Sequence, residues 1–429
     1  MDEQTQVTVE TETVLEEKPK KKKKKAGLII GIIAGVLALL LVAAIVLAGV
    51  IGIAGVAGWS LFGDGLFGGK DKEEYNLFNQ GLVPVMQTDK YGYINKDGKY
   101  EINPQFEDAR DFADNGLAAV CMDGKWGFID TEGKFAINPQ FEWVGDFAVN
   151  DLAAVCIDEK WGYIDKDGKF VINPIFDWAG MFDDNGLAIV FEDDKYGYIN
   201  RTTYVIQPQF DYAYSFADNG LAEVCMDDKW GFIDTEGKFA INPQFDRARS
   251  FGDNGLAAVY MDDKWGFIDT EGKFAINPQF EYALGFADNG LAAVRMDGKW
   301  GFIDTEGKFA INPQFDDALG FAENGLAAVQ SGDWWGYIDA EGKFVIEPRF
   351  DWVYSFDPVG LARVCEDDKY GYINKNTYVV YPQYGELSSY FFDDGYAVVE
   401  QDGKLGIIDT NGTYVVYPQY EDIAGHGFY

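Results

Sequence analysis

The sequence predicts an all-β fold built as a tandem array of ten repeats, and three observations lead to this prediction. First, the 429 residues include 50 Gly, 33 Phe, 25 Tyr and 11 Trp, a composition typical of turn-dense β structure. Second, an aromatic-Gly pair returns at intervals of 34 or 35 residues. Third, apolar and polar residues alternate with a period of two within each interval, as in half-buried strands.

The aromatic-Gly pair marks the ten units, which together occupy residues 76–429. The Gly never changes, an Ile follows two residues after it, and each phrase ends in Pro-x-aromatic. The first residue of the pair is Tyr91, Trp126, Trp161, Tyr196, Trp230, Trp265, Trp300, Trp335, Tyr370 and, where Leu replaces the aromatic, Leu405. We interpret these invariant positions as packing and backbone requirements of the scaffold.

Each unit is predicted to be a three-stranded antiparallel meander. In the second unit the expected strands cover residues 117–120, 126–129 and 135–141. Asp123-Gly124 predicts a tight hairpin turn between the first two strands, and residues 130–133 form the next turn. The connector that follows Pro-x-aromatic, such as residues 107–112, is expected to be a loop or a single helical turn.

Units of this size cannot bury a core alone, so they must stack on their neighbours. We expect an open, solenoid-like superhelix. The alternative is a β-propeller, which is less favoured because propellers usually have four to eight blades of four strands each.

The N-terminal residues predict a membrane anchor. Residues 1–25 contain Lys18 and the run Lys20–Lys25 and are expected to be a cytoplasmic tail. Residues 26–59 carry no charge and are long enough for a transmembrane helix, whereas a cleaved signal peptide has a shorter apolar region. Residues 60–75 read as a flexible stalk. By the positive-inside rule, we expect a single-pass protein of the cell membrane, with the lipid bilayer as a partner and the repeats outside the cytoplasm.

The net charge and the number of cysteines argue against two other classes, nucleic-acid-binding proteins and disulfide-rich proteins. The net charge of −36 argues against binding to nucleic acid. Four cysteines are too few for a disulfide framework in an array of this length. Their position in the repeat is occupied elsewhere by Met, Phe, Tyr, Arg, Gln or Glu, so we expect unpaired thiols, although a pair between Cys121 and Cys156 stays open.

Catalysis has little support in the sequence. The only histidine, His426, is the fourth residue from the C-terminus, and pairs of carboxylates recur in every unit instead of marking one place. The stretch Asp165–Gly168 lacks the glutamate that an EF-hand needs and is interpreted as a turn. We therefore predict no enzyme, no catalytic residue, no cofactor and no metal site, with weak cation binding by acidic loops left open.

The connector is the place where the ten copies differ most, and it carries the candidate binding residues. Two positions after the Pro-x-aromatic ring, one side chain varies between acid, base and aromatic, which a core position would not accept. Trp, Tyr and Arg are the types that dominate binding surfaces. The candidate ligand-binding residues are Trp143, Trp178, Tyr212, Arg247, Tyr282 and Trp352. The alternative is that some of these side chains cap neighbouring units.

The repeated phrase also resembles a known family. Its pattern K-[WY]-G-[FY]-I-[DN], as in Lys160–Asp165, with a downstream Pro-Gln-Phe, is similar to the WG (KWG) repeat of bacterial proteins. The resemblance covers nearly all of residues 76–429, with Leu405 as the clearest departure. Such proteins are commonly associated with the cell surface or envelope. The resemblance implies an all-β repeat scaffold and an interaction role, and it transfers no active site.

Two functions follow as hypotheses. The first is a membrane-anchored scaffold at the cell surface that binds a protein partner through the variable connectors. The second is a module that binds carbohydrate or cell-wall polysaccharide by stacking exposed aromatic rings on sugar faces.

Overall fold

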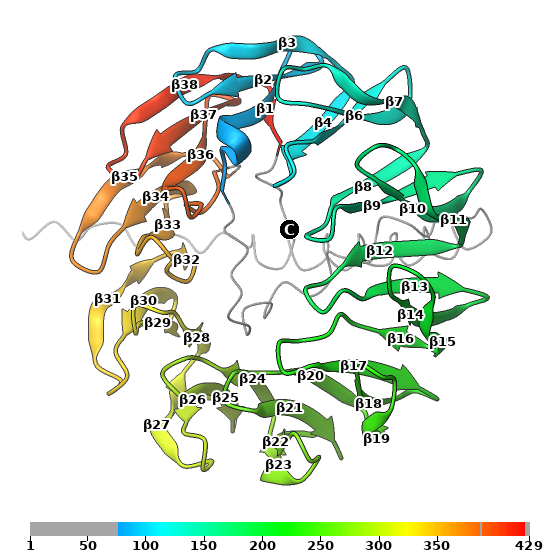
Figure 1. Cartoon of the computed structure of the whole chain (residues 1–429). Coiled ribbons are helices and arrows are strands. Elements are labelled where there is room, and N and C mark those ends of the chain that lie inside the picture. Colours follow the sequence, from blue (N-terminus) through cyan, green and yellow to red (C-terminus); the bar gives the residue numbers. More distant parts are fainter. Residues whose placement is uncertain (1–75, 387, 425–429) are drawn as a thin grey trace, which may run out of the picture. The chain divides into compact units, whose positions relative to one another are not determined.

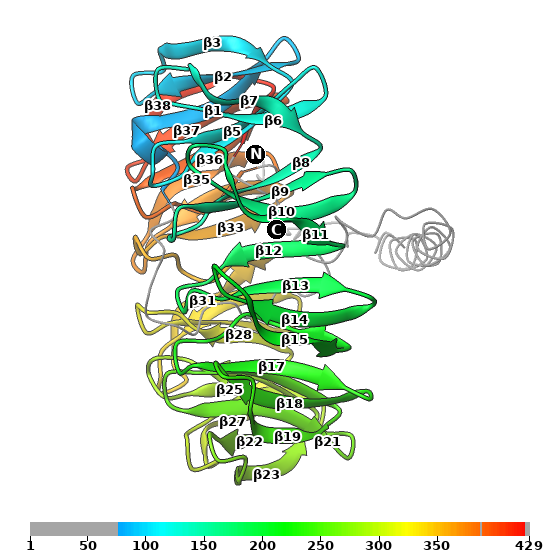
Figure 2. The same ribbon diagram turned by 45° about the vertical axis from the view of Figure 1, so that its right-hand side comes forward.

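The computed structural model describes residues 76–386 and 388–424. Within them, the chain forms ten antiparallel sheets that follow one another as blades around a common axis (Figure 1). The rotated view in Figure 2 shows successive blades, such as those around β9, β13 and β17, lying face to face. This part of the protein is therefore a ten-bladed β-propeller.

Within each blade, the strands are called first to fourth from the axis outward. The first strands are β39 (Asp422–Ile423), β4 (Asp108–Phe112), β8 (Trp143–Phe147), β12 (Trp178–Phe182), β16 (Tyr212–Ala213), β20 (Arg247–Phe251), β24 (Tyr282–Phe286), β28 (Asp317–Phe321) and β32 (Trp352–Val353). The second strands are β1 (Leu82–Gln87), β5 (Ala118–Met122), β9 (Leu152–Ile157), β13 (Ala188–Glu192), β17 (Leu221–Met226), β21 (Leu256–Met261), β25 (Ala292–Met296), β29 (Ala327–Ser331), β33 (Ala362–Glu366) and β36 (Tyr396–Gln401).

The third strands carry the aromatic-Gly pair, and the fourth strands end in Pro-x-aromatic. The third strands are β2 (Lys90–Asn95), β6 (Lys125–Ile129), β10 (Lys160–Asp165), β14 (Lys195–Ile199), β18 (Lys229–Asp234), β22 (Lys264–Asp269), β26 (Lys299–Ile303), β30 (Trp334–Ile338), β34 (Lys369–Ile373) and β37 (Lys404–Asp409). The fourth strands are β3 (Tyr100–Phe106), β7 (Phe135–Phe141), β11 (Phe170–Phe176), β15 (Tyr204–Phe210), β19 (Phe239–Phe245), β23 (Phe274–Phe280), β27 (Phe309–Phe315), β31 (Phe344–Phe350), β35 (Tyr378–Tyr384) and β38 (Tyr414–Tyr420). One short 3-10 helix, η1 (Asn79–Gly81), precedes β1.

Blade 1 is β39 with β1–β3, blade 2 is β4–β7, and the numbering continues to blade 9 (β32–β35) and blade 10 (β36–β38). Blade 1 joins the two ends of the described chain, because β39 pairs with β1 through Val85 and Ile423. Ten buried clusters fill the spaces between blades, and one of them packs Val398 and Ile407 of blade 10 against Val83 and Val85 of blade 1. The ring is therefore closed.

The expected open superhelix is wrong, and the propeller kept as the alternative is correct. Each sheet has two apolar faces, so an open stack would leave one face uncovered at either end, whereas closure buries both. The three-stranded unit is also wrong for nine of the ten blades, because the connector supplies a first strand. A shift of register between Ala109 and Phe112 leaves Arg110 and Asp111 both half-exposed, so the connector lacks the alternation that marks a strand.

The predicted turns and the invariant Gly have direct explanations. Asp123 and Gly124 both have positive φ angles (52° and 70°), as a tight hairpin turn requires. The Gly of the pair meets the backbone of the fourth strand. A Cβ on Gly127 would lie 2.6 Å from the carbonyl oxygen of Ile137 and 2.6 Å from the nitrogen of Pro139, so no side chain fits there.

The cysteine question is also settled. Cys121, Cys156, Cys225 and Cys365 are buried and free. Each lies on the second strand of its blade, directly opposite the aromatic residue of the pair. The expectation of unpaired thiols is confirmed.

The membrane prediction is corrected. No helix in residues 76–386 and 388–424 is long and apolar enough to cross a bilayer. The expected transmembrane helix, lipid partner and cell-membrane location are therefore withdrawn. The segments on which they rested, residues 1–25, 26–59 and 60–75, lie outside the described residues, as does His426.

Candidate functional site

In each four-stranded blade, the pairing of the strands places one residue of the first, second and third strands in a row across the sheet. In blade 8, Asp317 on the first strand lies opposite Gln330, and Gln330 lies opposite Trp335 on the third strand. Residues directly opposite each other in an antiparallel pair point to the same side of the sheet. The variable connector residue and the aromatic of the pair therefore share one face of each blade.

The rows of neighbouring blades place aromatic side chains next to one another along part of the propeller. The Trp265 ring lies 5.8 Å from that of Tyr282, which lies 5.6 Å from Trp300. Trp335 meets Trp352 of the next blade at 5.1 Å. We call these residues the aromatic belt: Trp143, Trp178, Tyr196, Tyr212, Trp230, Trp265, Tyr282, Trp300, Trp335, Trp352 and Tyr370.

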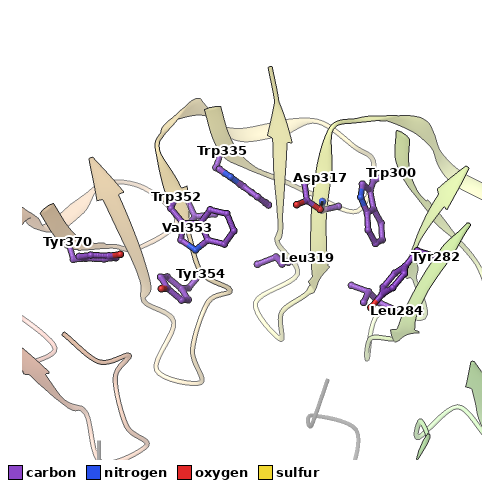
Figure 3. A pocket seen from close by; sticks show the side chains of 11 residues that line it. Tyr282, Leu284, Trp300, Asp317, Leu319, Trp335, Trp352, Val353, Tyr354 and Tyr370 are labelled. Atoms are coloured by element: carbon purple, nitrogen blue, oxygen red, sulfur yellow. Dashed lines mark hydrogen bonds between the residues drawn. The ribbon is translucent and has the colours of Figure 1, made fainter. Parts of the chain in front are cut away.

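A cavity of about 600 Å³ opens in the belt between blades 7, 8 and 9. Its walls are mostly aromatic: Tyr282, Trp300, Trp335, Trp352, Tyr354 and Tyr370. Leu284, Leu319, Ala318 and Val353 complete the apolar lining, and Asp317 supplies the one carboxylate. Figure 3 shows Asp317 between Trp300 and Trp335, with Tyr370 and Tyr282 at opposite ends.

Buried tyrosine hydroxyls fix the first strand on one side of the cavity. The hydroxyl of Tyr337, in the third strand of blade 8, donates a 2.7 Å hydrogen bond to the carbonyl oxygen of Tyr354 in blade 9. Burial, followed by the proximity of Tyr354, raises the pKa of Tyr370 to about 12, so its hydroxyl stays protonated at neutral pH. The cavity wall therefore offers neutral rings and a fixed backbone.

Arginine side chains of the protein cover several aromatic rings of the belt and of the same faces of the blades. The Arg110 guanidinium lies 5.1 Å from the Trp126 ring. Arg249 lies 5.3 Å from Trp265 and 5.4 Å from Tyr282, and it donates to the Tyr282 hydroxyl at 2.7 Å. Arg363 lies 4.0 Å from Tyr354. The faces of these rings are thus suitable for a guanidinium group.

The structure places each predicted binding residue at the start of a first strand. Of the six, only Tyr282 and Trp352 line the cavity. Tyr212 is 60% exposed and stacks between Tyr196 and Trp230, with ring centroids 6.3 Å from each. Trp143 is 52% exposed, Trp178 is half-buried and Arg247 is exposed, each at the same register in another blade.

The sequence interpretation missed Trp300, Trp335 and Tyr370. Because the aromatic of the pair varies between Trp, Tyr and Leu, we took it as a purely structural ring. Trp335 is 1% exposed and well packed, yet the edge of its ring forms part of the cavity wall. Trp335 and the variable connector residue Asp317 both lie opposite Gln330, on the same face of the sheet. This register could be recognised from the sequence only if the connector were predicted to form the first strand.

The sequence of the repeats decides the family. The model of the WG containing repeat matches ten consecutive segments, at residues 91–126, 126–161, 161–196, 196–230, 230–265, 265–300, 300–333, 335–370, 370–404 and 406–428. The chain belongs to the WG-repeat family. Each match runs from one aromatic-Gly pair to the next, so a WG repeat contains the third and fourth strands of one blade and the first two of the following blade.

Solved structures show only a distant likeness to this WG-repeat chain. A eukaryotic initiation factor shares 11% identity over 80% of this chain and 96% of its own, with a TM-score of 0.49. Hsv2p of Kluyveromyces lactis shares 12% identity over 58% of this chain and 98% of its own, with a TM-score of 0.36. The dihydro-heme d1 dehydrogenase NirN shares 14% identity over 85% of this chain and 76% of its own, also with a TM-score of 0.36. A search of curated proteins returned no match.

Proposed function

We propose that this WG-repeat propeller is a protein-interaction module that binds a partner along the aromatic belt. One observation carries the proposal: large aromatic side chains are exposed at equivalent positions of several blades. Trp143, Tyr212 and Trp352 are 52%, 60% and 45% exposed. Exposed aromatic residues grouped on one surface are typical of interfaces.

Binding, and not catalysis, is the activity that we assign to the chain. The belt consists of aromatic rings, with a few arginine and acidic side chains beside it, and such groups are suited to binding a partner. The six predicted residues keep their proposed role as ligand-binding residues, with Tyr282 and Trp352 at the cavity. Carbohydrate binding is the second candidate, because flat indole faces at exposed positions also suit sugar rings.

A binding experiment separates the two candidates. The full chain would be immobilised and exposed in parallel to protein extract and to purified cell-wall polysaccharide. We expect a defined protein to be retained by the wild type and lost from the triple variant Trp143→Ala, Trp178→Ala, Trp352→Ala. The double variant Tyr381→Ala, Tyr417→Ala, whose rings are 71% exposed on fourth strands outside the belt, is the control. Retention of polysaccharide that depends on the three tryptophans would contradict the protein-binding proposal.

A further inference from the structure

We infer that the cavity between blades 7, 8 and 9 binds a basic side chain, an arginine or a lysine, of a partner protein segment. This inference rests on the proposed protein-binding function and adds the chemistry of the partner. Its basis is a contrast within the cavity wall: Tyr282, Tyr354 and Tyr370 have an arginine of the chain over their rings, whereas Trp300 and Trp352 have none among the described residues.

The first argument is the repeated use of arginine on aromatic rings of the blades. Arg110 and Arg249 occupy the third residue of their first strands and reach the rings of Trp126 and Trp265 at 5.1 and 5.3 Å. In blades 7 and 8 the same position holds Leu284 and Leu319. Of the cavity rings, Tyr282 has Arg249 at 5.4 Å, and Tyr354 and Tyr370 have Arg363 at 4.0 and 4.9 Å. Trp335 is 1% exposed, so Trp300 and Trp352 are the rings that the described residues leave without a cation.

The second argument is the charge of the lining. The cavity wall includes the Asp317 carboxylate and no basic side chain of the described chain. Asp317 accepts the N–H of Ala318 at 2.8 Å, which leaves further lone pairs on its carboxylate for a ligand. Arg295 lies opposite both Tyr282 and Trp300 on the sheet, with its guanidinium 3.9 Å from Glu281, and it is not a lining residue. Aromatic faces together with one carboxylate attract a cation and repel an anion.

The third argument is size and overall charge. A volume of about 600 Å³ admits a long side chain with part of the segment that carries it. The chain has a net charge of −36, so a basic segment is attracted from a distance and an acidic one is repelled. An extended basic peptide fits these conditions better than a sugar, which would gain nothing from the charge.

The test measures binding of two peptides to the full chain by calorimetry: an alternating Gly–Arg hexapeptide and the matching Gly–Gln hexapeptide. We expect the Gly–Arg peptide to bind and the Gly–Gln peptide to bind at least about tenfold more weakly, since the cation contacts are lost. Raising the salt concentration should weaken the Gly–Arg complex. Equal affinity for both peptides would overturn the inference.

Two variants with matched controls locate the site. Asp317→Asn keeps the shape and removes the charge, and it should weaken Gly–Arg binding about fivefold or more. Asp108→Asn, at the same register in blade 2, should not, although Asp108 also accepts its neighbour's N–H at 2.8 Å. Trp352→Ala should weaken binding about tenfold, whereas Tyr381→Ala, whose ring is 71% exposed on a fourth strand outside the belt, should leave it unchanged. Equal effects in either pair would overturn the assignment to this cavity.

The outcome separates this inference from the proposed function. If the three-tryptophan variant loses its protein partner while neither peptide binds, the inference fails and the proposed function stands. If no protein depends on the belt and no peptide binds, both fail. Binding of a neutral oligosaccharide at the cavity, lost in Trp352→Ala and unchanged in Asp317→Asn, would also overturn the inference.

Discussion

Blades 2 and 8 are built on the same plan, and their first strands differ at two residues, the third and the fourth. Both begin that strand with an aspartate, Asp108 and Asp317, and both carry Trp in the pair. The third residue is Arg110 in blade 2 and Leu319 in blade 8. Arg110 covers Trp126 and lies 3.7 Å from Asp146, whereas Leu319 leaves room for a cavity.

This difference distinguishes the residues that build the scaffold from those that determine the chemistry of its surface. Every blade repeats the Gly, the Ile and the Pro-x-aromatic because these residues determine how strands and blades pack. The third residue of the first strand is not repeated in this way: it is Arg110 in blade 2 and Leu319 in blade 8, and Leu319 packs against the apolar cluster between blades 8 and 9. A change at this position therefore alters the chemistry beside the adjacent rings.

The largest expected effect comes from a residue that all blades share. Gly336→Ala would place a Cβ 2.5 Å from the carbonyl oxygen of Ile346, a contact that only backbone movement can relieve. We expect a loss of about 4 kcal/mol in the free energy of unfolding, measured by denaturant titration. Gly320→Ala in the same blade is the control, since no atom lies within 4 Å of its added Cβ. A similar loss in both variants would show that the close approach is not the reason for the Gly.

The second effect is a pH dependence at the junction of blades 9 and 10. Burial raises the pKa of Asp357 to about 7, although the N–H groups of Leu361 and Phe391 donate to its carboxylate and act in the opposite direction. The folded state therefore holds this proton more tightly than the unfolded state, and stability falls as pH rises from about 4 to about 7. In Asp357→Asn this fall disappears, so the stability of the variant relative to wild type should increase by up to about 1.4 kcal/mol per pH unit.

A second aspartate provides the control for the pH experiment. The pKa of Asp409 is lowered, because the N–H groups of Thr413 and Asn411 outweigh its partial burial. Its contribution to stability is present above the unfolded pKa and is lost as pH falls. Asp409→Asn should therefore lose stability relative to wild type as pH rises through about 4. The same slope for both variants would contradict the assignment of opposite shifts.

A single substitution tests the comparison of blades 2 and 8, because it gives blade 8 the arginine that blade 2 has at the third residue of the first strand. Leu319→Arg should place a guanidinium over the rings of the cavity, as Arg110 does in blade 2. We expect at least about tenfold weaker binding of the Gly–Arg peptide, because the internal cation repels the ligand and fills the space. Leu319→Met, which keeps the volume and adds no charge, should bind nearly as wild type. Unchanged affinity in Leu319→Arg would show that position 319 does not control the cavity.

The smallest expected effect concerns the hydrogen bonds between blades. Tyr337→Phe removes the donor to the carbonyl oxygen of Tyr354 and should lower the free energy of unfolding by about 1 kcal/mol. Tyr417→Phe, on a ring that is 71% exposed, should change it by less than about 0.5 kcal/mol. Equal losses would mean that the hydroxyl of Tyr337 contributes no more than a surface group.

Much of the blade could be predicted from the sequence, because local chemistry determines it. Alternation identified the strand that ends at Phe141, and Asp123-Gly124 identified the hairpin turn. The first strand could not be predicted, since the bulge at Arg110 and Asp111 removes the alternation. Ring closure could not be predicted either, because it depends on the angle between blades, which small differences in side-chain packing determine.

The candidate site was only partly predictable. Tyr282 and Trp352 were found because their position varies between acid, base and aromatic along the chain. Trp335 was not, because a well-packed ring in a repeated phrase has no distinguishing sequence feature. The cavity also requires residues from three successive blades, and the sequence alone does not show that their side chains leave a space between them.

Closure through β39 and β1 has a consequence for how such a protein can change its length. In an open stack, a duplicated repeat adds one more layer and alters no other contact. Here each blade occupies one tenth of a full turn, so an eleventh blade would require every wedge between sheets to become narrower at once. The number of repeats is therefore fixed collectively by all ten interfaces, and duplication or loss of one repeat must be accompanied by adjustment of the others.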